Sequence, residues 1–201
     1  MTLGGRSGVS FEALFHSGHA GRDNFRSRLF GMFNEEIVRY WAANERAPYR
    51  DLGRPTLWTA AEFATLDFTL QSRADGRRYV AEQKAELAFE GYRYLRLTAA
   101  SQVQHHATRR AFRWFLDAAR EPASHLVKVS ASPTEVAGAI LVWGAITPDG
   151  RADAMETYGF ADVLAIEDML RDLRDWDDPA WRARVEEIRG WANGLFDALT
   201  W

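Results

Sequence analysis

Two alternating segments that flank an Asp-Gly pair constrain the fold of this chain more than any other feature. The segments are Ala64–Gln71 and Arg78–Leu87, and Asp75-Gly76 lies among the six residues between them. Alternation of apolar and polar residues is typical of strands, and Asp-Gly favours a tight turn because both of its residues accept positive φ. The sequence therefore predicts an antiparallel β-hairpin at this point.

Helices and further strands are expected on both sides of the hairpin. Apolar residues recur at helical spacing before it and after it, with a Pro-rich and Gly-rich loop at Arg46–Pro55. The expected elements are helices over Asn24–Asn44 and Ala99–Ala119, strands over Leu126–Ser132 and Val136–Ile146 (the latter closed by Pro148-Asp149-Gly150), a strand followed by a helix within Gly159–Leu173, and a last helix from Pro179. This order predicts an α/β sandwich around a mixed sheet.

Length and composition fit one domain. The chain has 201 residues, 47% of them hydrophobic, which is enough for a single core over residues 24–201 after a Gly-rich and Ser-rich flexible N-terminal arm, residues 1–23. It has no cysteine, which excludes disulfides, zinc-thiolate sites and thiol nucleophiles. No apolar run approaches the ~18 residues of a membrane span, and no signal sequence is visible, so we expect a cytoplasmic protein.

The net charge of −3 hides an asymmetry. Residues 1–120 carry 18 basic and 13 acidic side chains, whereas residues 121–201 carry 7 and 15. Arginines gather in the basic part as Arg22/Arg26/Arg28, Arg73/Arg77/Arg78 and Arg109/Arg110/Arg113. Such clusters can line a phosphate-binding face, and an ordinarily charged surface is the alternative.

The hairpin brings three charged side chains to one face. If the turn is the two-residue Asp75-Gly76 loop, Asp67 lies opposite Lys84, and Glu82 lies on the diagonal from Asp67. Diagonal residues are about 7–8 Å apart, so two carboxylates can converge on one divalent ion. An all-oxygen pair completed by water suits Mg²⁺ or Mn²⁺ better than zinc. An incidental cross-strand Asp–Lys pair on a surface hairpin is the alternative.

Asp67, followed by Glu82-Gln83-Lys84 on the next strand, resembles the motif of the PD-(D/E)xK (restriction-endonuclease-like) nuclease superfamily. The resemblance covers about Asn24 to Arg120, although Leu66 stands where the family name has Pro. It implies a three-layer sandwich with a central mixed β-sheet flanked by helices, and metal-dependent hydrolysis of phosphodiester bonds. Asp67 and Glu82 would then bind the metal, and Lys84 would orient the water or stabilise transition-state charge.

The resemblance also implies roles outside the hairpin. Glu36 lies within the apolar arc of the first helix, where the family often has an auxiliary metal ligand, whereas Glu35 falls outside the arc, four residues before Arg39. A Glu36 that reaches solvent or an arginine is the alternative. Gln102 and Gln104 stand where relatives place groups that contact the phosphate. His16, His19, His105 and His106 are interpreted as structural or surface residues.

The leading hypothesis is thus a Mg²⁺-dependent nuclease that acts on DNA in restriction, defence or repair, with a homodimer as one option for its assembly. One alternative is a non-catalytic module of the same fold that binds nucleic acid or a protein partner. Another is a small-molecule α/β protein in which the hairpin carboxylates are incidental. The retained Asp/Glu/Lys set favours the enzyme, and the acidic C-terminal third favours the binding module.

Overall fold

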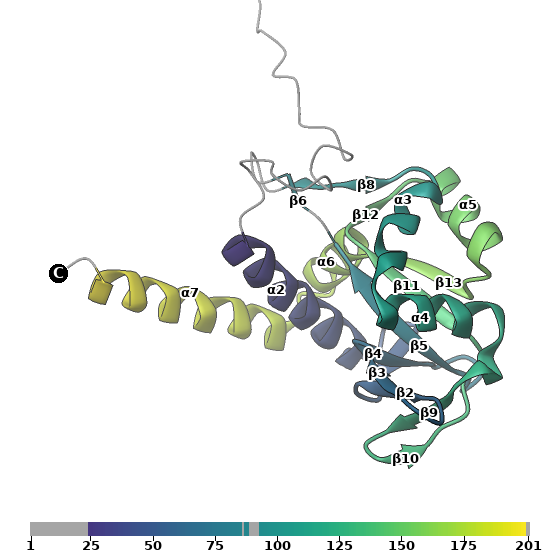
Figure 1. Cartoon of the computed structure of the whole chain (residues 1–201). Coiled ribbons are helices and arrows are strands. Elements are labelled where there is room, and N and C mark those ends of the chain that lie inside the picture. The colour runs from purple at the N-terminus through teal and green to yellow at the C-terminus, as the bar shows by residue number, and fades with distance from the viewer. Residues whose placement is uncertain (1–23, 86, 89–92, 200–201) are drawn as a thin grey trace, which may run out of the picture.

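The centre of the protein is a five-stranded mixed β-sheet. The computed structural model describes residues 24–85, 87–88 and 93–199, so the expected N-terminal arm lies outside the described residues. The strands follow the spatial order β1-β4-β5-β11-β13 (Figure 1). Their bounds are β1 Tyr49–Asp51, β4 Phe68–Ser72, β5 Arg78–Lys84, β11 Ala139–Trp143 and β13 Asp162–Ala165. β4 is antiparallel to β1 and β5, whereas β5, β11 and β13 run parallel.

Helices cover both faces of this sheet. The helices are α2 Asn24–Ala43, α4 Arg110–Arg120, α5 Pro148–Tyr158, α6 Ile166–Asp175 and α7 Pro179–Leu199. α2 and α6 pack on one face, and α4 and α5 pack on the other. β11 reads Ala-Ile-Leu-Val-Trp and is buried throughout, as expected for a parallel strand that is covered on both sides. The expected α/β arrangement of a mixed sheet between helices is therefore confirmed.

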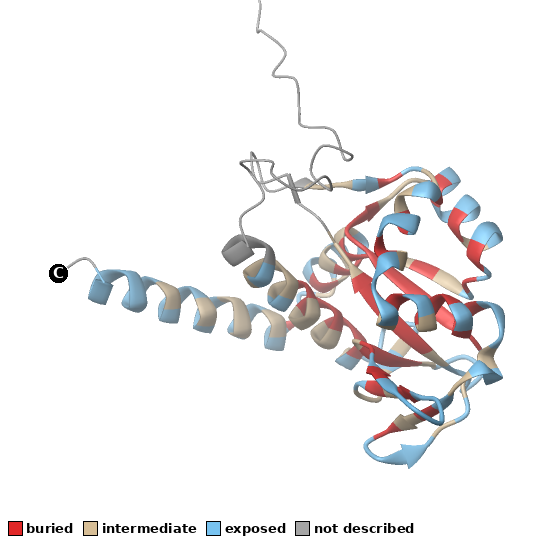
Figure 2. Ribbon diagram, viewed as in Figure 1, coloured by how far each residue is buried: buried red, intermediate tan, exposed pale blue. Residues whose placement is uncertain are grey.

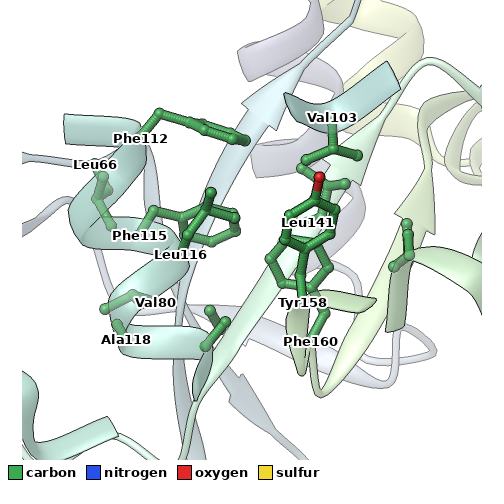
Figure 3. Close-up of a cluster of buried hydrophobic side chains, with 14 of the residues drawn as sticks. Leu66, Val80, Val103, Phe112, Phe115, Leu116, Ala118, Leu141, Tyr158 and Phe160 are labelled. Carbon is green, nitrogen blue, oxygen red and sulfur yellow. The ribbon is translucent and has the colours of Figure 1, made fainter. Parts of the chain in front are cut away.

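The core is divided by the sheet into two clusters. Leu141 of β11 contributes to the cluster under α4 and α5, whereas Ile140 and Val142 contribute to the one under α2 and α6. Figure 3 shows the first cluster, which contains Phe112 and Phe115 of α4 together with Val80 and Leu141 of the sheet. Figure 2 shows the buried residues concentrated in the central strands and in the helix faces turned towards them.

A second, smaller sheet adjoins the first. Its order is β10-β9-β2-β3, with bounds Ser132–Pro133, Leu126–Val129, Pro55–Trp58 and Phe63–Thr65. Leu57 and Val127 on its inner face join the cluster under α4. The remaining short elements are β6 Leu87–Ala88 with β7 Arg93–Tyr94, β8 Arg96–Leu97 with β12 Ala145–Ile146, α3 Ser101–Gln104, and the 3₁₀ turns η1 His105–Thr108 and η2 Pro122–Ser124.

The segment predicted as one strand over Ala64–Gln71 is two strands in the structure. β3 pairs with β2 in the small sheet and β4 pairs with β1 and β5 in the large one, so the chain changes sheets at Leu66 and Asp67. The predicted loop over Arg46–Pro55 likewise contains β1. Asp67 therefore lies at the junction between the two sheets.

Three other boundaries differ from the prediction. The helix predicted over Ala99–Ala119 is interrupted at Arg109, whose ψ of 133° is extended. The strand predicted over Val136–Ile146 is β11 followed by β12. Pro148-Asp149-Gly150 opens α5 instead of closing a strand as a turn, because the Thr147 Oγ1 accepts a hydrogen bond from the Gly150 amide at 3.0 Å and Pro148 starts the helix.

The last helix, α7, begins at Pro179 as predicted and projects from the body of the molecule (Figure 1). None of its described residues is buried, although Trp181 packs against Tyr40 of α2 with ring centroids 5.7 Å apart. Within the described part of the chain, no helix combines the length and hydrophobicity that crossing a membrane requires.

Candidate active site

The hairpin forms between β4 and β5, but in a different register from the predicted one. Thr69 pairs with Val80, whereas the two-residue turn would place it opposite Glu82. The Ser72 amide donates to the Arg77 carbonyl at 2.8 Å, so the loop contains four residues, 73–76. Of Asp75 and Gly76, only Gly76 has a positive φ, 74°, and the two-residue turn requires it of both.

The register differs by two residues, and an even shift leaves every side chain on its original face. Val80 of β5 packs under α4, and the side chain of Gln83 reaches the Gly31 carbonyl of α2 at 3.4 Å on the opposite face. Glu82 and Lys84 therefore face α4, and the Lys84 Nζ lies 5.5 Å from the ring centroid of Phe112. Glu82 and Lys84 therefore share the face that was expected of them.

Asp67 is fixed at the point where the chain leaves β3 for β4. Its Oδ2 accepts a hydrogen bond from the backbone amide of Gln83 at 2.9 Å, which ties it to the end of β5. Its Oδ1 lies 3.4 Å from Nη2 of Arg54, whose side chain is about half exposed at 54%. Extending the β4–β5 register places Asp67 opposite Glu82 rather than Lys84.

Glu82 and Lys84 form a close, largely buried pair. The Lys84 Nζ donates to Glu82 Oε1 at 2.5 Å and to the Gln83 carbonyl at 2.9 Å. Glu82 is only 7% exposed, and its second oxygen, Oε2, meets no hydrogen-bond donor within the described residues. Burying a carboxylate oxygen without a donor costs free energy unless a proton or a cation compensates for it.

Burial raises the pKa of Glu82 from its ordinary value of 4.5 to about 7. The nearby Asp67 carboxylate also raises this pKa through its charge and a hydrogen bond, whereas the Lys84 ammonium lowers it. Burial and the second carboxylate thus outweigh the ion pair with Lys84. A site that disfavours two neighbouring negative charges in this way favours a cation between them.

These residues fit a magnesium ion that keeps part of its water shell. Mg²⁺ is usually held by one or two carboxylates plus water and substrate phosphate, and Asp67, just before β4, and Glu82 of β5 supply two neighbouring carboxylates. Over residues 24–85, 87–88 and 93–199, no group of three or more His, Cys, Asp or Glu side chains could enclose a metal. The donor set therefore suits a hydrated, substrate-completed ion rather than an all-protein cage.

Glu36 does not join this group, which corrects the expected direction of its side chain. It lies on α2, on the sheet face opposite to Glu82, and its carboxylate binds Arg184 of α7 at 3.0 Å and Arg39 at 3.2 Å. The expected Glu35–Arg39 pair is present at 2.7 Å, yet the Glu35 and Glu36 side chains are similarly exposed, at 26% and 24%. A carboxylate on an apolar helix face needs a partner, and Arg184 supplies it because α7 packs beside α2.

The two glutamines bind their own surroundings. The Gln102 Oε1 accepts from the amides of Thr98 at 2.7 Å and Ala99 at 3.1 Å, so it caps the turn before α3. The exposed Gln104 accepts from the Tyr158 hydroxyl of α5 at 3.3 Å. Among the described contacts, none links either glutamine to Asp67, Glu82 or Lys84.

Sequence reasoning missed Arg54 and the aromatic wall of the site. Arg54 contacts Asp67 across 13 residues of chain, a proximity that arises only because β2 and β3 pair. Phe112 lies under Lys84, and the buried ring of His106 packs against Phe112 and Trp143 at 5.4 and 5.7 Å. The buried His106 agrees with the structural role expected of the histidines, whereas His16 and His19 lie outside the described residues.

Comparison with known proteins adds no relative to this geometry. No family model, no curated protein and no solved structure matches the chain.

Proposed function

We propose that this protein is a Mg²⁺-dependent nuclease that hydrolyses phosphodiester bonds of DNA, in restriction, defence or repair. The observation that carries the proposal is the buried Glu82, which has one oxygen bound to Lys84 and the other without a donor beside Asp67. The helix–hairpin–helix order around these residues and the mixed sheet between helices support the resemblance to the PD-(D/E)xK, restriction-endonuclease-like fold.

Asp67 and Glu82 would hold the ion. When bound, Mg²⁺ lowers the pKa of an attacking water and neutralises charge on the phosphate. The amide of Gln83 and the guanidinium of Arg54 keep Asp67 oriented towards the end of β5. Preorganisation of this kind avoids the cost of reorienting the carboxylate when substrate binds.

Lys84 would stabilise negative charge and orient the water. Its ammonium is 17% exposed, held by Glu82 and a backbone carbonyl, and fixed above the Phe112 ring. A positively charged group held in this way suits electrostatic stabilisation of the transition state.

The test is cleavage of plasmid, linear and single-stranded DNA with Mg²⁺ or Mn²⁺. Asp67→Ala and Lys84→Ala should each lower cleavage by roughly 10²–10³, the usual effect of losing one preorganised charged group. Glu36→Gln is the matched control, because Glu36 is a partly buried, ion-paired carboxylate on the other face of the sheet, and it should cleave like the wild type.

A non-catalytic module that binds nucleic acid or a protein is the alternative. Wild-type protein that cleaves none of the substrates and shows no Mg²⁺ binding by calorimetry would favour this alternative over the enzyme.

A further inference from the structure

The outer face of the small sheet carries ordered rows of side chains that the proposed catalytic group does not use. Trp58 of β2 pairs directly with Phe63 of β3 and with Leu126 of β9. Directly opposed residues share a face. Leu57, the next residue on β2, is fully buried in the core, so the row made by Trp58, Phe63 and Leu126 points away from it.

This row is an exposed aromatic surface. Trp58 is 36% exposed, Phe63 54% and Leu126 51%. The rings of Trp58 and Phe63 lie 5.0 Å apart with an interplanar angle of 31°, so each supports the other. We call this set (Trp58, Phe63 and Leu126) the aromatic platform.

Cations lie beside the platform. Lys128 is opposite Thr56 in the next row, and its Nζ lies 5.1 Å from the Trp58 ring centroid. Arg110 of α4 donates to the Phe63 carbonyl at 3.2 Å and binds Glu62, which lies in the turn between β2 and β3, at 2.8 Å. The chain has only two lysines, and one lies at the candidate site and the other at this platform.

The strands that carry the platform lead to Asp67. β3 runs from Phe63 towards Asp67, and Arg54, the residue before β2, pairs with the Asp67 carboxylate. Four residues of strand span at most about 13 Å, which is the length of a few nucleotides. A strand of nucleic acid lying along this face would pass Lys128 and Arg54 before reaching Asp67.

We propose that the aromatic platform binds unpaired bases of a single-stranded DNA segment whose backbone continues to the Asp67–Glu82–Lys84 site. This inference rests on the proposed nuclease function and specifies its substrate as DNA with unpaired nucleotides. Base faces are available for stacking on aromatic rings only when the bases are not stacked within a duplex. Lysine and arginine beside the rings supply the electrostatic attraction to the phosphates.

The test measures binding separately from cleavage. Anisotropy of a fluorescein-labelled oligothymidylate is recorded with the wild-type protein in EDTA, where Mg²⁺-dependent cleavage cannot occur. Trp58→Ala and Phe63→Ala should each raise Kd by roughly 5- to 150-fold, the usual range for losing one base–aromatic contact. Lys128→Gln should reduce the slope of log Kd against log salt concentration by about one, the contribution of one phosphate contact.

Trp191→Ala is the matched control, because Trp191 is an exposed tryptophan of α7, 66% exposed and outside the small sheet, and its loss should leave Kd unchanged. Unchanged melting temperatures would show that the platform variants are folded. Wild-type affinity in Trp58→Ala, equal weakening by Trp191→Ala, or tighter binding of a blunt duplex than of the single strand would overturn the proposal, and tighter binding of oligouridylate would overturn its assignment to DNA.

The two proposals fail in different ways. If the wild type cleaves DNA and Trp58→Ala cleaves both duplex and single-stranded DNA as well as the wild type does, the platform proposal is wrong and the nuclease proposal stands. If the single strand binds in a Trp58-dependent manner but nothing is cleaved, the platform stands and the nuclease is wrong.

Discussion

Replacing Glu82 with glutamine should stabilise the metal-free protein at alkaline pH. Glutamine has nearly the shape of a protonated glutamate and cannot ionise. Because the folded-state pKa of Glu82 is raised to about 7 from 4.5, the folded protein holds a proton that the unfolded chain releases. The contribution of Glu82 to the free energy of unfolding is therefore fully present below pH 4.5, falls as the pH rises through this window, and is lost above 7.

The size of the effect follows from that shift. Each pKa unit corresponds to about 1.4 kcal/mol, so ionising Glu82 in the folded state costs on the order of 3 kcal/mol. At pH 5 Glu82 is protonated in the folded wild type, so Glu82→Gln removes no ion pair there. At pH 8 the variant loses the ion pair with Lys84, but the favourable effect of Lys84 is already contained in the pKa of about 7. The difference between the variant's advantage at pH 8 and at pH 5 therefore measures the ionisation of Glu82. For a chain of this size, about 3 kcal/mol corresponds to a difference in melting temperature of roughly 6–12 °C.

The assay is thermal unfolding in EDTA at pH 5 and pH 8, followed by circular dichroism. Glu186→Gln is the control, because Glu186 is 61% exposed and paired only with Arg189 among the described contacts, and it should follow the wild type at both pH values. Adding Mg²⁺ at pH 8 should raise the melting temperature of the wild type and leave that of Glu82→Gln nearly unchanged. Parallel pH dependence in wild type and Glu82→Gln would refute the argument that burial destabilises the ionised carboxylate.

Three further results are expected. Asp67→Ala should abolish the Mg²⁺-induced rise in melting temperature, and calorimetric binding equal to that of the wild type would contradict the assignment of Asp67 as a ligand. Thr147→Ala removes the N-cap of α5 and should lower the free energy of unfolding by about 1 kcal/mol in urea, so an unchanged midpoint would count against the cap. Gly150→Ala would bring a methyl group into the Leu97 carbonyl and should destabilise the protein more than Thr147→Ala does; the reverse order in urea would show that the backbone can shift.

The sequence contained enough information to place the hairpin and its charged face. The alternation in β4 and β5 fixed which side chains share a face, and that result survives any register error of two residues. The register itself depends on the turn, and Asp-Gly does not distinguish a two-residue loop from the four-residue loop over residues 73–76. That choice depends on contacts such as the hydrogen bond between the Arg73 side chain and the Ala42 carbonyl at 3.1 Å, which local sequence does not encode.

The position of Glu36 shows where local pattern stops being informative. Helical phase placed Glu36 within the apolar arc of α2 and Glu35 outside it, yet the two side chains are similarly exposed, and phase does not say which face of the sheet the helix covers. The partner of Glu36 is Arg184, 148 residues away on a helix whose packing is decided by the tertiary structure. The same holds for Arg54, which reaches Asp67 only after β2 and β3 pair.

Burial separates an incidental surface pair from a functional group at the hairpin. A cross-strand Asp–Lys pair on a surface hairpin would be solvated, contribute little to stability and leave each carboxylate near its ordinary pKa. Here Glu82 is 7% exposed and its pKa is raised to about 7. The charge of the neighbouring Asp67 carboxylate further disfavours the ionised form of Glu82. The Gln83 amide and Arg54 hold Asp67 at this position, although the charge of Asp67 raises the pKa of Glu82. Residues that break local rules at a cost in stability concentrate at functional sites. A divalent cation bound between the two carboxylates would remove this cost, and this argument favours the proposed metal site over an incidental ion pair.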